Sequence, residues 1–457
     1  MKKITLLCTI ACFAIGFGAT GCSSDEEGGG GGGDAFEYVS STGNCQLLAE
    51  GDVYMGMMVS TGGDVWPVPE FTTIAQVAVN QINSNNGLGN GRTLGAIICD
   101  SQCLPEAANP VLDELLATKE TNGIDIGVIV GPSCSYVAVD MIETIKEAQI
   151  ALIGPSTESA ELTDAADGDF YFRTISSGAQ IGAAQGAYLA TEQNIEKLAM
   201  VYVDDAWGGG MAAQTAAAFA AAVGKTVEES VLLIPYISED EDASNDLDAA
   251  AALTAIDGFM EDGVKGAAFL LGYDADTAFS GLFAAISAKN DWTHGAPHWE
   301  LSNGLTPEFW NIVNDSGLLE GMGGITPKVP DSDAAAWFAE QMTANLNRDV
   351  EPYWANTSDA IFMGAIGLAL AADPADGASV RDALRLTSTG DLMGPRDWAN
   401  IVTAIEAGSS VDFDGSSGPL DFDANGDVDQ QFTHQSFNAS GEYITTGCWM
   451  PDGSTCD

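Results

Sequence analysis

Two short segments rich in hydroxyl side chains are suited to hold a small anionic group. Residues 131–135 read Gly-Pro-Ser-Cys-Ser, and residues 154–163 read Gly-Pro-Ser-Thr-Glu-Ser-Ala-Glu-Leu-Thr. Hydroxyl groups beside the free backbone N–H groups of a helix N-terminus can bind a carboxylate. The same serines, Ser135, Ser156 and Ser159, could instead only cap the helices that follow, because serine is a preferred N-cap residue.

The serine-rich segments follow short apolar runs that alternate with longer amphipathic stretches. The runs expected as strands are 53–60, 93–99, 124–130, 150–153, 198–203, 231–234 and 266–271. The stretches expected as helices are 71–83, 105–119, 137–148, 179–193, 211–223, 247–261, 277–288, 333–345 and 358–371. Such alternation predicts an α/β fold with two doubly wound parallel-sheet lobes joined by a hinge. Ligands in these folds bind beyond the C-terminal ends of the strands, where both serine-rich segments fall.

The charge of the chain is strongly negative. Its 457 residues include 66 acidic and 15 basic side chains, which gives a net charge of −51. This charge excludes nucleic acid as a partner and indicates a saline environment that screens the repulsion. Hydrophobic residues make up 46% of the chain, enough for a substantial core.

The N-terminus has the pattern of a lipoprotein signal peptide. Lys2 and Lys3 precede an apolar run at 4–19, and Cys22 follows small residues. We expect cleavage after residue 21 and lipidation of Cys22, with 22–50 as a linker that contains six glycines. The alternative is an uncleaved signal anchor. The lipid would hold the protein on the periplasmic side of a membrane, inner or outer.

Several motifs, taken in order, connect the chain to a family. They are 131–135, 155–163, Phe-Arg-Thr at 172–174 followed by Gln180, 201–208, Gly-Tyr at 272–273, and 418–427. Over residues 52–445 the chain resembles the type 1 periplasmic binding proteins that bind substrate for branched-chain amino-acid (Leu/Ile/Val) ABC transporters. This resemblance implies an N-terminal lobe of 51–175 plus 326–430, a C-terminal lobe of 176–325 plus 431–447, and a tail at 448–457.

The resemblance also implies the ligand contacts. An amino acid would lie between the lobes, with its carboxylate on the Ser135 hydroxyl and on backbone groups of Ser156 and Glu158. The remaining contacts implied are the aromatic residues Trp207 and Tyr273, an acidic partner for the ligand ammonium near Glu300 to Ser302, and Trp66 as a cover. Trp207 is expected to be exposed, because its neighbours are aspartates and glycines.

Glu158 departs from the family pattern, which has a small hydroxyl residue at this position. Its carboxylate would repel a ligand carboxylate if it points inward. One hypothesis is that the ammonium-binding acid has moved to Glu158; another is that the ligand is a cation or an amide. An unchanged ligand affinity in Glu158→Ser would exclude both.

Six cysteines besides Cys22 follow the signal peptide, and an even number in an exported chain indicates disulfides. The resemblance implies a bridge between Cys103 and Cys134, which leaves Cys448 with Cys456 and Cys45 with Cys99. We expect no metal and no cofactor. Residues 421–429 are similar to a calcium loop, but Phe432 stands where a bidentate Glu is needed, so we expect a hairpin turn.

These observations favour a binding protein over an enzyme. No histidine lies in a predicted cleft loop beside a nucleophile, and Gly and Pro separate His294 from His298. The expected function is a lipid-anchored, monomeric solute-binding protein that delivers an amino acid or a similar small solute to an ABC permease and ATPase. The alternative is a sensor of the same fold, because transport and sensing both use hinge closure around a ligand.

Overall fold

The computed structural model describes residues 38–63, 65–237, 247–272, 277–303, 310, 313, 316–452 and 454–456. The predictions for the signal peptide, for Cys22, for the six glycines and for Tyr273 lie outside these residues. Among the described residues, no helix is both long enough and apolar enough to cross a membrane.

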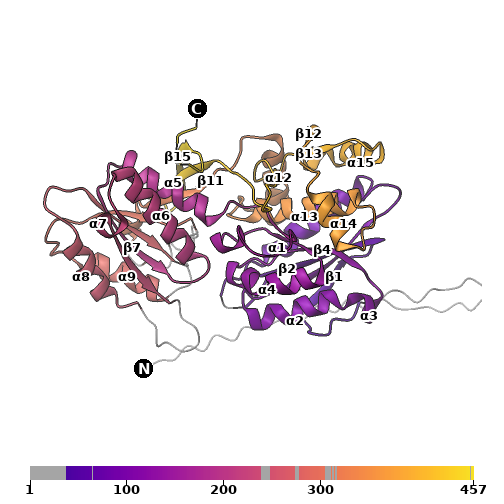
Figure 1. Cartoon of the computed structure of the whole chain (residues 1–457), viewed down its shortest axis with the longest axis horizontal. Coiled ribbons are helices and arrows are strands. Elements are labelled where there is room, and N and C mark those ends of the chain that lie inside the picture. Colours follow the sequence, from indigo (N-terminus) through magenta and orange to yellow (C-terminus); the bar gives the residue numbers. More distant parts are fainter. Residues whose placement is uncertain are drawn as a thin grey trace, which may run out of the picture. The chain divides into compact units, whose positions relative to one another are not determined.

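The first sheet has six strands in the order β1-β3-β2-β4-β5-β6 (Figure 1). β1 runs antiparallel to β3, and the other neighbours pair in parallel. The strands are β1 (Cys45–Ala49), β2 (Val53–Val59), β3 (Leu94–Asp100), β4 (Ile126–Val130), β5 (Ala151–Gly154) and β6 (Tyr171–Arg173). The strands expected at 53–60, 93–99, 124–130 and 150–153 are therefore present, with β1 and β6 added at the two edges.

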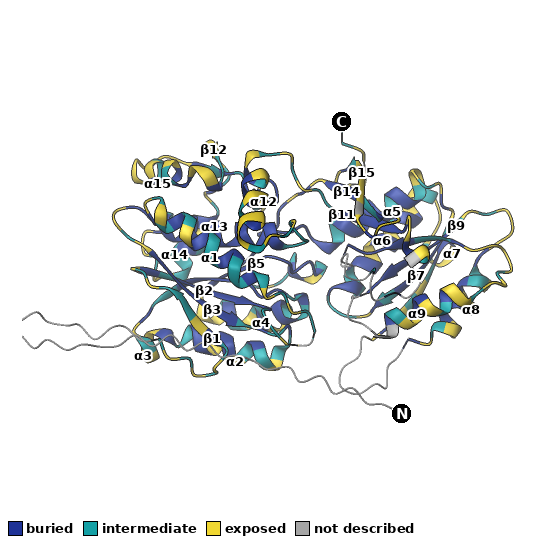
Figure 2. Cartoon of the chain, turned by 180° about the vertical axis from the view of Figure 1, so that it is seen from behind, coloured by how far each residue is buried: buried dark blue, intermediate teal, exposed yellow. Residues whose placement is uncertain are grey.

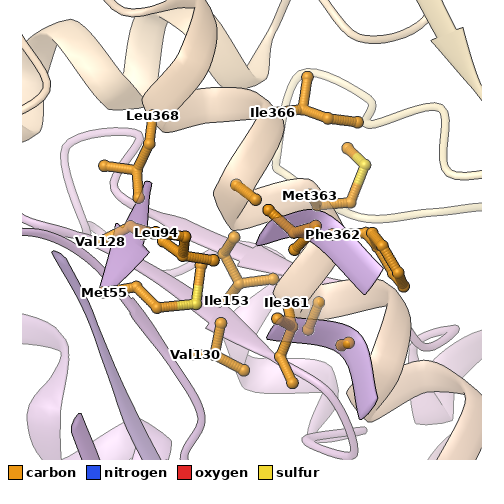
Figure 3. Packing of buried hydrophobic residues seen from close by; sticks show 14 of the residues in the cluster. Met55, Leu94, Val128, Val130, Ile153, Ile361, Phe362, Met363, Ile366 and Leu368 are labelled. Carbon is orange, nitrogen blue, oxygen red and sulfur yellow. The ribbon is translucent and has the colours of Figure 1, made fainter. Parts of the chain in front are cut away.

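Helices cover both faces of this sheet. The first set is α1 (Glu70–Ser84), α2 (Pro105–Leu116), α3 (Thr118–Asn122) and α4 (Ser135–Ala148). The second set returns from far along the chain: α12 (Asp333–Leu346), α13 (Trp354–Leu370), α14 (Gly377–Leu384) and α15 (Trp398–Glu406). On one face Phe362 and Ile366 of α13 pack with Met55, Val128 and Ile153 of the sheet (Figure 3). Helix α13 is buried on all sides, and after its polar first turns its sequence is apolar around the whole circumference, from Ala360 to Leu370.

The second sheet has four parallel strands in the order β10-β9-β7-β8. They are β7 (Lys197–Val203), β8 (Val231–Tyr236), β9 (Gly266–Leu271) and β10 (His298–Leu301). The helices before, between and after these strands are α5 (Gly178–Thr191), α6 (Gly208–Val223), α7 (Val227–Ser230), α8 (Ala249–Phe259), α9 (Thr277–Ala288) and α11 (Ser316–Leu319). Helices α5 and α6 pack closely, because a Cβ on Gly186 would lie 2.5 Å from the Thr215 carbonyl oxygen. In both sheets the strands are mostly buried and exposed residues lie on the helices (Figure 2).

Two smaller sheets follow the returning chain. β11 (Gly323–Pro327), β14 (Phe432–Phe437) and β15 (Tyr443–Trp449) pair antiparallel, and β12 (Asp391–Met393) pairs in parallel with β13 (Val411–Phe413). Short 3-10 helices occur at η1 (Ala160–Leu162) and η2 (Pro395–Asp397). The α/β fold class with two parallel-sheet lobes is confirmed, and the lobe boundaries stay a prediction.

The turn expected at 421–429 differs from a hairpin. The Asp423 carboxylate accepts hydrogen bonds from the backbone N–H groups of Asn425 and Asp427, which closes a tight turn. The flanking residues are not a pair of strands, since β13 pairs with β12 and β14 pairs with β11 and β15. Gly426 has φ +83°, and a Cβ there would lie 2.2 Å from the Tyr171 carbonyl oxygen. The turn is thus shaped to sit against β6.

Candidate functional site: a buried carboxylate between two sets of loops

Glu158 lies in the loop after β5, and its side chain has no solvent exposure. One carboxylate oxygen accepts a hydrogen bond of 2.7 Å from Trp207 Nε1, at the start of α6. The other oxygen accepts one of 2.9 Å from Asn303 Nδ2, just after β10. The carboxylate therefore joins a loop of the first sheet to two loops of the second.

Burial and hydrogen bonding shift the pKa of the Glu158 carboxylate in opposite directions. Loss of solvation is the larger effect, and it raises the pKa of Glu158 to about 7. Hydrogen bonds from Trp207, Asn303 and the Tyr353 hydroxyl, together with the positive charge of Arg173, lower the pKa and so limit the rise. Near neutral pH the group is divided between its ionised and protonated forms.

Arg173, on β6, fixes the loop that carries Glu158. Its Nη1 donates to the carbonyl oxygens of Thr157 at 3.1 Å and Ser159 at 2.8 Å, the two residues on either side of Glu158. Its Nε and Nη2 donate to the two carboxylate oxygens of Asp427 at 2.7 and 2.8 Å. The guanidinium thus links the Glu158 loop to the turn at 423–427.

The predicted serines connect the loops of the first sheet. Ser135 Oγ accepts from the Ser159 backbone N–H at 3.1 Å, and Ser156 Oγ donates to the Ser133 carbonyl oxygen at 2.7 Å. Ser159 Oγ accepts from the Glu161 N–H and caps η1. The capping alternative therefore describes Ser159, whereas Ser135 and Ser156 hold neighbouring loops together beside Glu158.

Trp207 corrects one expectation. It is 6% exposed, although its acidic and glycine-rich neighbours predicted an exposed side chain. The ring packs in the core of the second lobe while Nε1 reaches Glu158. The neighbouring Asp205 carboxylate accepts from the N–H groups of Trp207 and Gly208 at the start of α6, so that acidic residue serves the helix terminus.

Glu300, predicted near the ligand ammonium, is occupied by histidines. It is 1% exposed; one oxygen lies 2.6 Å from His298 Nε2 and the other 3.2 Å from His434 Nε2. The His434 ring also stacks on Tyr188, with 4.7 Å between centroids. Ser302 lies beside this group and lines a small cavity of about 10 Å³ together with Asn303.

Trp66 is connected to the Glu158 cluster through one intervening residue, Tyr353. Its ring meets Tyr353 edge-to-face, with 5.4 Å between centroids, and Tyr353 in turn bonds Glu158. Tyr353 has a left-handed backbone, φ +68°, which is strained for a large side chain and typical of functional positions. Trp66, predicted as an aromatic cover, therefore contacts the cluster through Tyr353.

The structure pairs Cys45 with Cys99, Cys103 with Cys134, and Cys448 with Cys456. The second bridge joins the loops after β3 and β4, beside Ser135. In the described part of the chain, no group of three or more His, Cys, Asp or Glu side chains is arranged to hold a metal ion.

Comparison with known proteins identifies the family to which this fold belongs. Residues 73–433 match the model of the family described as "Receptor family ligand binding region". The chain belongs to this family. Membership confirms a ligand-binding protein rather than an enzyme, and it confirms the resemblance to type 1 periplasmic binding proteins.

Individual members of related groups are distant in sequence. An amino acid binding protein of Pseudomonas aeruginosa is 26% identical over 180 residues, which cover 39% of this chain and 46% of the relative. The matched segment thus spans about half the length of that curated relative.

Solved structures share the fold. A leucine-binding protein of Thermotoga maritima is 15% identical with a TM-score of 0.66, over 88% of this chain and 99% of that one. A branched-chain amino-acid transporter substrate-binding protein of Streptococcus pneumoniae, in complex with isoleucine, is 19% identical with a TM-score of 0.62, over 86% and 99%. A solute-binding protein from R. palustris, in complex with benzoate, is 18% identical with a TM-score of 0.60, over 87% and 96%.

Within this family fold, the sequence reasoning missed three members of the cluster. Asn303 directly follows Ser302, the last residue of the segment predicted to face the ligand ammonium. Arg173 belongs to a motif that carried the resemblance, but its role became visible only with its carbonyl partners. Tyr353 had no sequence signal, because its strained backbone and its contact with Glu158 arise from tertiary structure.

Proposed function

We propose that this protein is the solute-binding component of an ABC importer and captures an amino acid or a similarly small polar solute between its lobes. The observation that carries the proposal is the Glu158 carboxylate, buried under hydrogen-bond donors from the loops of both sheets. Polar groups that converge from two lobes are typical of a cleft that closes around a ligand. The relatives described as amino-acid-binding and leucine-binding support the choice of solute.

The roles of individual residues follow from this proposal. Ser135 and Ser156 order the loops that present backbone N–H groups to the solute. Trp207 and Asn303 contribute side-chain N–H donors from the second lobe. Tyr353, supported by Trp66, closes the cluster. Tyr273 and Ser302 remain proposed ligand contacts. Glu300 contributes to the site indirectly, through His298 and His434, which it holds in place.

The proposed location is the outer face of a membrane. Cys22, behind an apolar run and small residues, supports a lipid anchor after removal of residues 1–21. A glycine-rich linker would let the monomer reach a permease driven by its ATPase. The three disulfides support an extracytoplasmic, oxidising compartment.

Thermal unfolding of the purified protein against the common amino acids, small amides and polyamines tests the function. A solute at a hundred times its dissociation constant stabilises the folded state by about 2.7 kcal/mol. For lobes of this size each kcal/mol corresponds to roughly 2–4 °C, so the expected rise in Tm is about 5–10 °C.

Trp207→Phe keeps an aromatic ring, smaller than indole, and removes the Nε1–H group that Glu158 accepts, so we expect it to reduce the shift. Trp292→Phe is the matched control, since the Trp292 ring lies apart from Glu158 and meets the Trp299 ring edge-to-face. A panel in which no solute raises Tm would contradict the proposed function.

A further inference from the structure

The C-terminal end of the chain carries a short disulfide loop beyond the middle of β15 (Figure 1). Cys448, on β15, is bridged to Cys456, eight positions later. The segment between them folds back as a small hairpin: Trp449 pairs antiparallel with Thr455, and the Cys456 N–H donates to the Cys448 carbonyl oxygen at 3.0 Å. The bridge therefore joins two segments that backbone hydrogen bonds also hold side by side.

A lysine lies against this bridge. Lys328 directly follows β11, and its ammonium lies 3.7 Å from Cys448 Sγ and 3.4 Å from Gln431 Oε1. The Lys328 backbone N–H donates to the Gln431 carbonyl oxygen at 2.7 Å, which fixes the lysine at the start of β14. In the part of the chain that the structure describes, the ammonium has no carboxylate partner. Its positive charge therefore acts on the sulfur and on a neutral amide.

The two sulfurs of the bridge have different surroundings. An ammonium beside a cysteine stabilises the thiolate, and a more stable thiolate is the better leaving group in thiol–disulfide exchange. Lys328 lies at Cys448, which is also held in place by its neighbour Trp449, 5% exposed and packed in the core of the second lobe. Cys456 is the last but one residue of the chain. An attacking thiol is thus directed to Cys456, with Cys448 as the leaving group.

The other two bridges are less accessible to a thiol. Cys45 is 8% exposed, Cys99 1% and Cys103 0%. Cys134 is half-buried, but attack on its sulfur would release Cys103 as a thiolate in the protein interior, which is costly. In the C-terminal bridge both cysteines are half-buried. Among the three bridges, this one alone combines partial access to both sulfurs with a neighbouring ammonium.

We propose that the Cys448–Cys456 bridge is a covalent modification site for small thiols, which are captured as a mixed disulfide on Cys456. The thiol loses its proton to solvent, and its sulfur attacks Cys456 Sγ. The bond between the two cysteine sulfurs breaks, and its electron pair stays on Cys448 as a thiolate beside the Lys328 ammonium. The thiol sulfur is oxidised to the disulfide level and the Cys448 sulfur is reduced, so no other oxidant or reductant is needed.

The proposal goes beyond solute binding and does not depend on it. Its first test is the position of the adduct in the wild-type protein. The native protein is treated with 2-mercaptoethanol at pH 8, and free thiols are trapped with excess N-ethylmaleimide. Digestion with pepsin at acid pH preserves mixed disulfides, and fragmentation mass spectrometry locates each group. We expect the mercaptoethanol adduct on Cys456 and the maleimide on Cys448.

The second test is the rate at which each bridge opens. We expect the C-terminal bridge to open at least about tenfold faster than Cys45–Cys99 and Cys103–Cys134, because its cysteines are accessible and its leaving group is stabilised.

Variants of the lysine test the role given to its charge. Lys328→Met keeps most of the side-chain length and removes the charge, so we expect the C-terminal bridge to open about fivefold more slowly. Lys328→Arg keeps the charge and should restore most of the rate. Lys119→Met is the matched control, since Lys119 is exposed on α3 and pairs with Asp125. Circular dichroism of each variant verifies that it is folded.

Three results would each overturn the proposal. The first is a mercaptoethanol adduct that forms mainly on Cys448. The second is a C-terminal bridge that opens no faster than the two buried bridges. The third is a folded Lys328→Met protein that reacts at the wild-type rate. The solute-binding function is measured separately by the rise in Tm with solute, so it stands or fails independently of these results.

Discussion

Arg173 and Asp427 form a bidentate ion pair between residues that are 254 positions apart in the sequence, and the guanidinium of Arg173 is fully buried. The arginine also donates to the carbonyl groups on either side of Glu158. The pair therefore connects the site loop to the turn at 423–427, and the loop geometry depends on a segment near the C-terminus.

We expect Asp427→Asn to destabilise the protein by about 3–5 kcal/mol, because it leaves a buried guanidinium without its counter-charge. Urea unfolding measures the change. Glu340→Gln is the control: its pair with Arg396 is exposed and contributes less than about 1 kcal/mol. Equal effects of the two substitutions would contradict the role given to Asp427.

Glu158 makes the stability depend on pH in an unusual direction. Its pKa is about 7 in the folded protein and near 4.5 when unfolded. Between these values the folded state keeps a proton that the unfolded state has lost, so the free energy of unfolding falls as pH rises, by about 3 kcal/mol from this group. Urea unfolding from pH 4.5 to pH 8 measures the slope.

Glu158→Gln should remove most of this slope and be more stable than wild type at pH 8. A residual slope of the same sign is expected from Asp359, because burial raises its pKa to about 6 despite hydrogen bonds from Ser416 and Ser417. A wild-type stability that rises between pH 5 and pH 7 would contradict the assignment.

The disulfides should differ in their contribution to stability. Cys45–Cys99 encloses a separation of 54 residues and Cys448–Cys456 one of 8. The chain-entropy model predicts a loss of about 4 kcal/mol when the first is replaced by paired alanines and about 2.5 kcal/mol for the second. Denaturant titration of the two double variants checks the order, and a larger loss for the C-terminal bridge would contradict it.

Much of the fold was predictable from local patterns. Strands such as β2 and β9 are continuous apolar runs because both of their faces are buried, and the alternation with helices determined the parallel sheets. The edge strand β1 was missed, because its residues are only partly buried and carry a weak apolar pattern.

The site was predictable only in part, for a physical reason. Glu158 and Trp207 lie directly after strands, where topology places ligand contacts. Asn303 and Tyr353 join them through tertiary packing, and Trp207 is buried in the core of the second lobe, with its Nε1–H on Glu158, despite its polar neighbours in the chain. Local composition carries no information on such contacts.

The net charge of −51 makes stability depend on salt. Repulsion among carboxylates opposes the compact state, and raising ionic strength from 0.1 M to 1 M shortens the screening length from about 10 Å to about 3 Å. We expect the Tm to rise in NaCl, with most of the gain below about 1 M, where screening is not yet complete. Sucrose at matched osmolarity is the control, since it favours compact states without screening charge. A Tm that rises equally in sucrose, or that stays constant in NaCl, would contradict a destabilising role of the repulsion among the carboxylates.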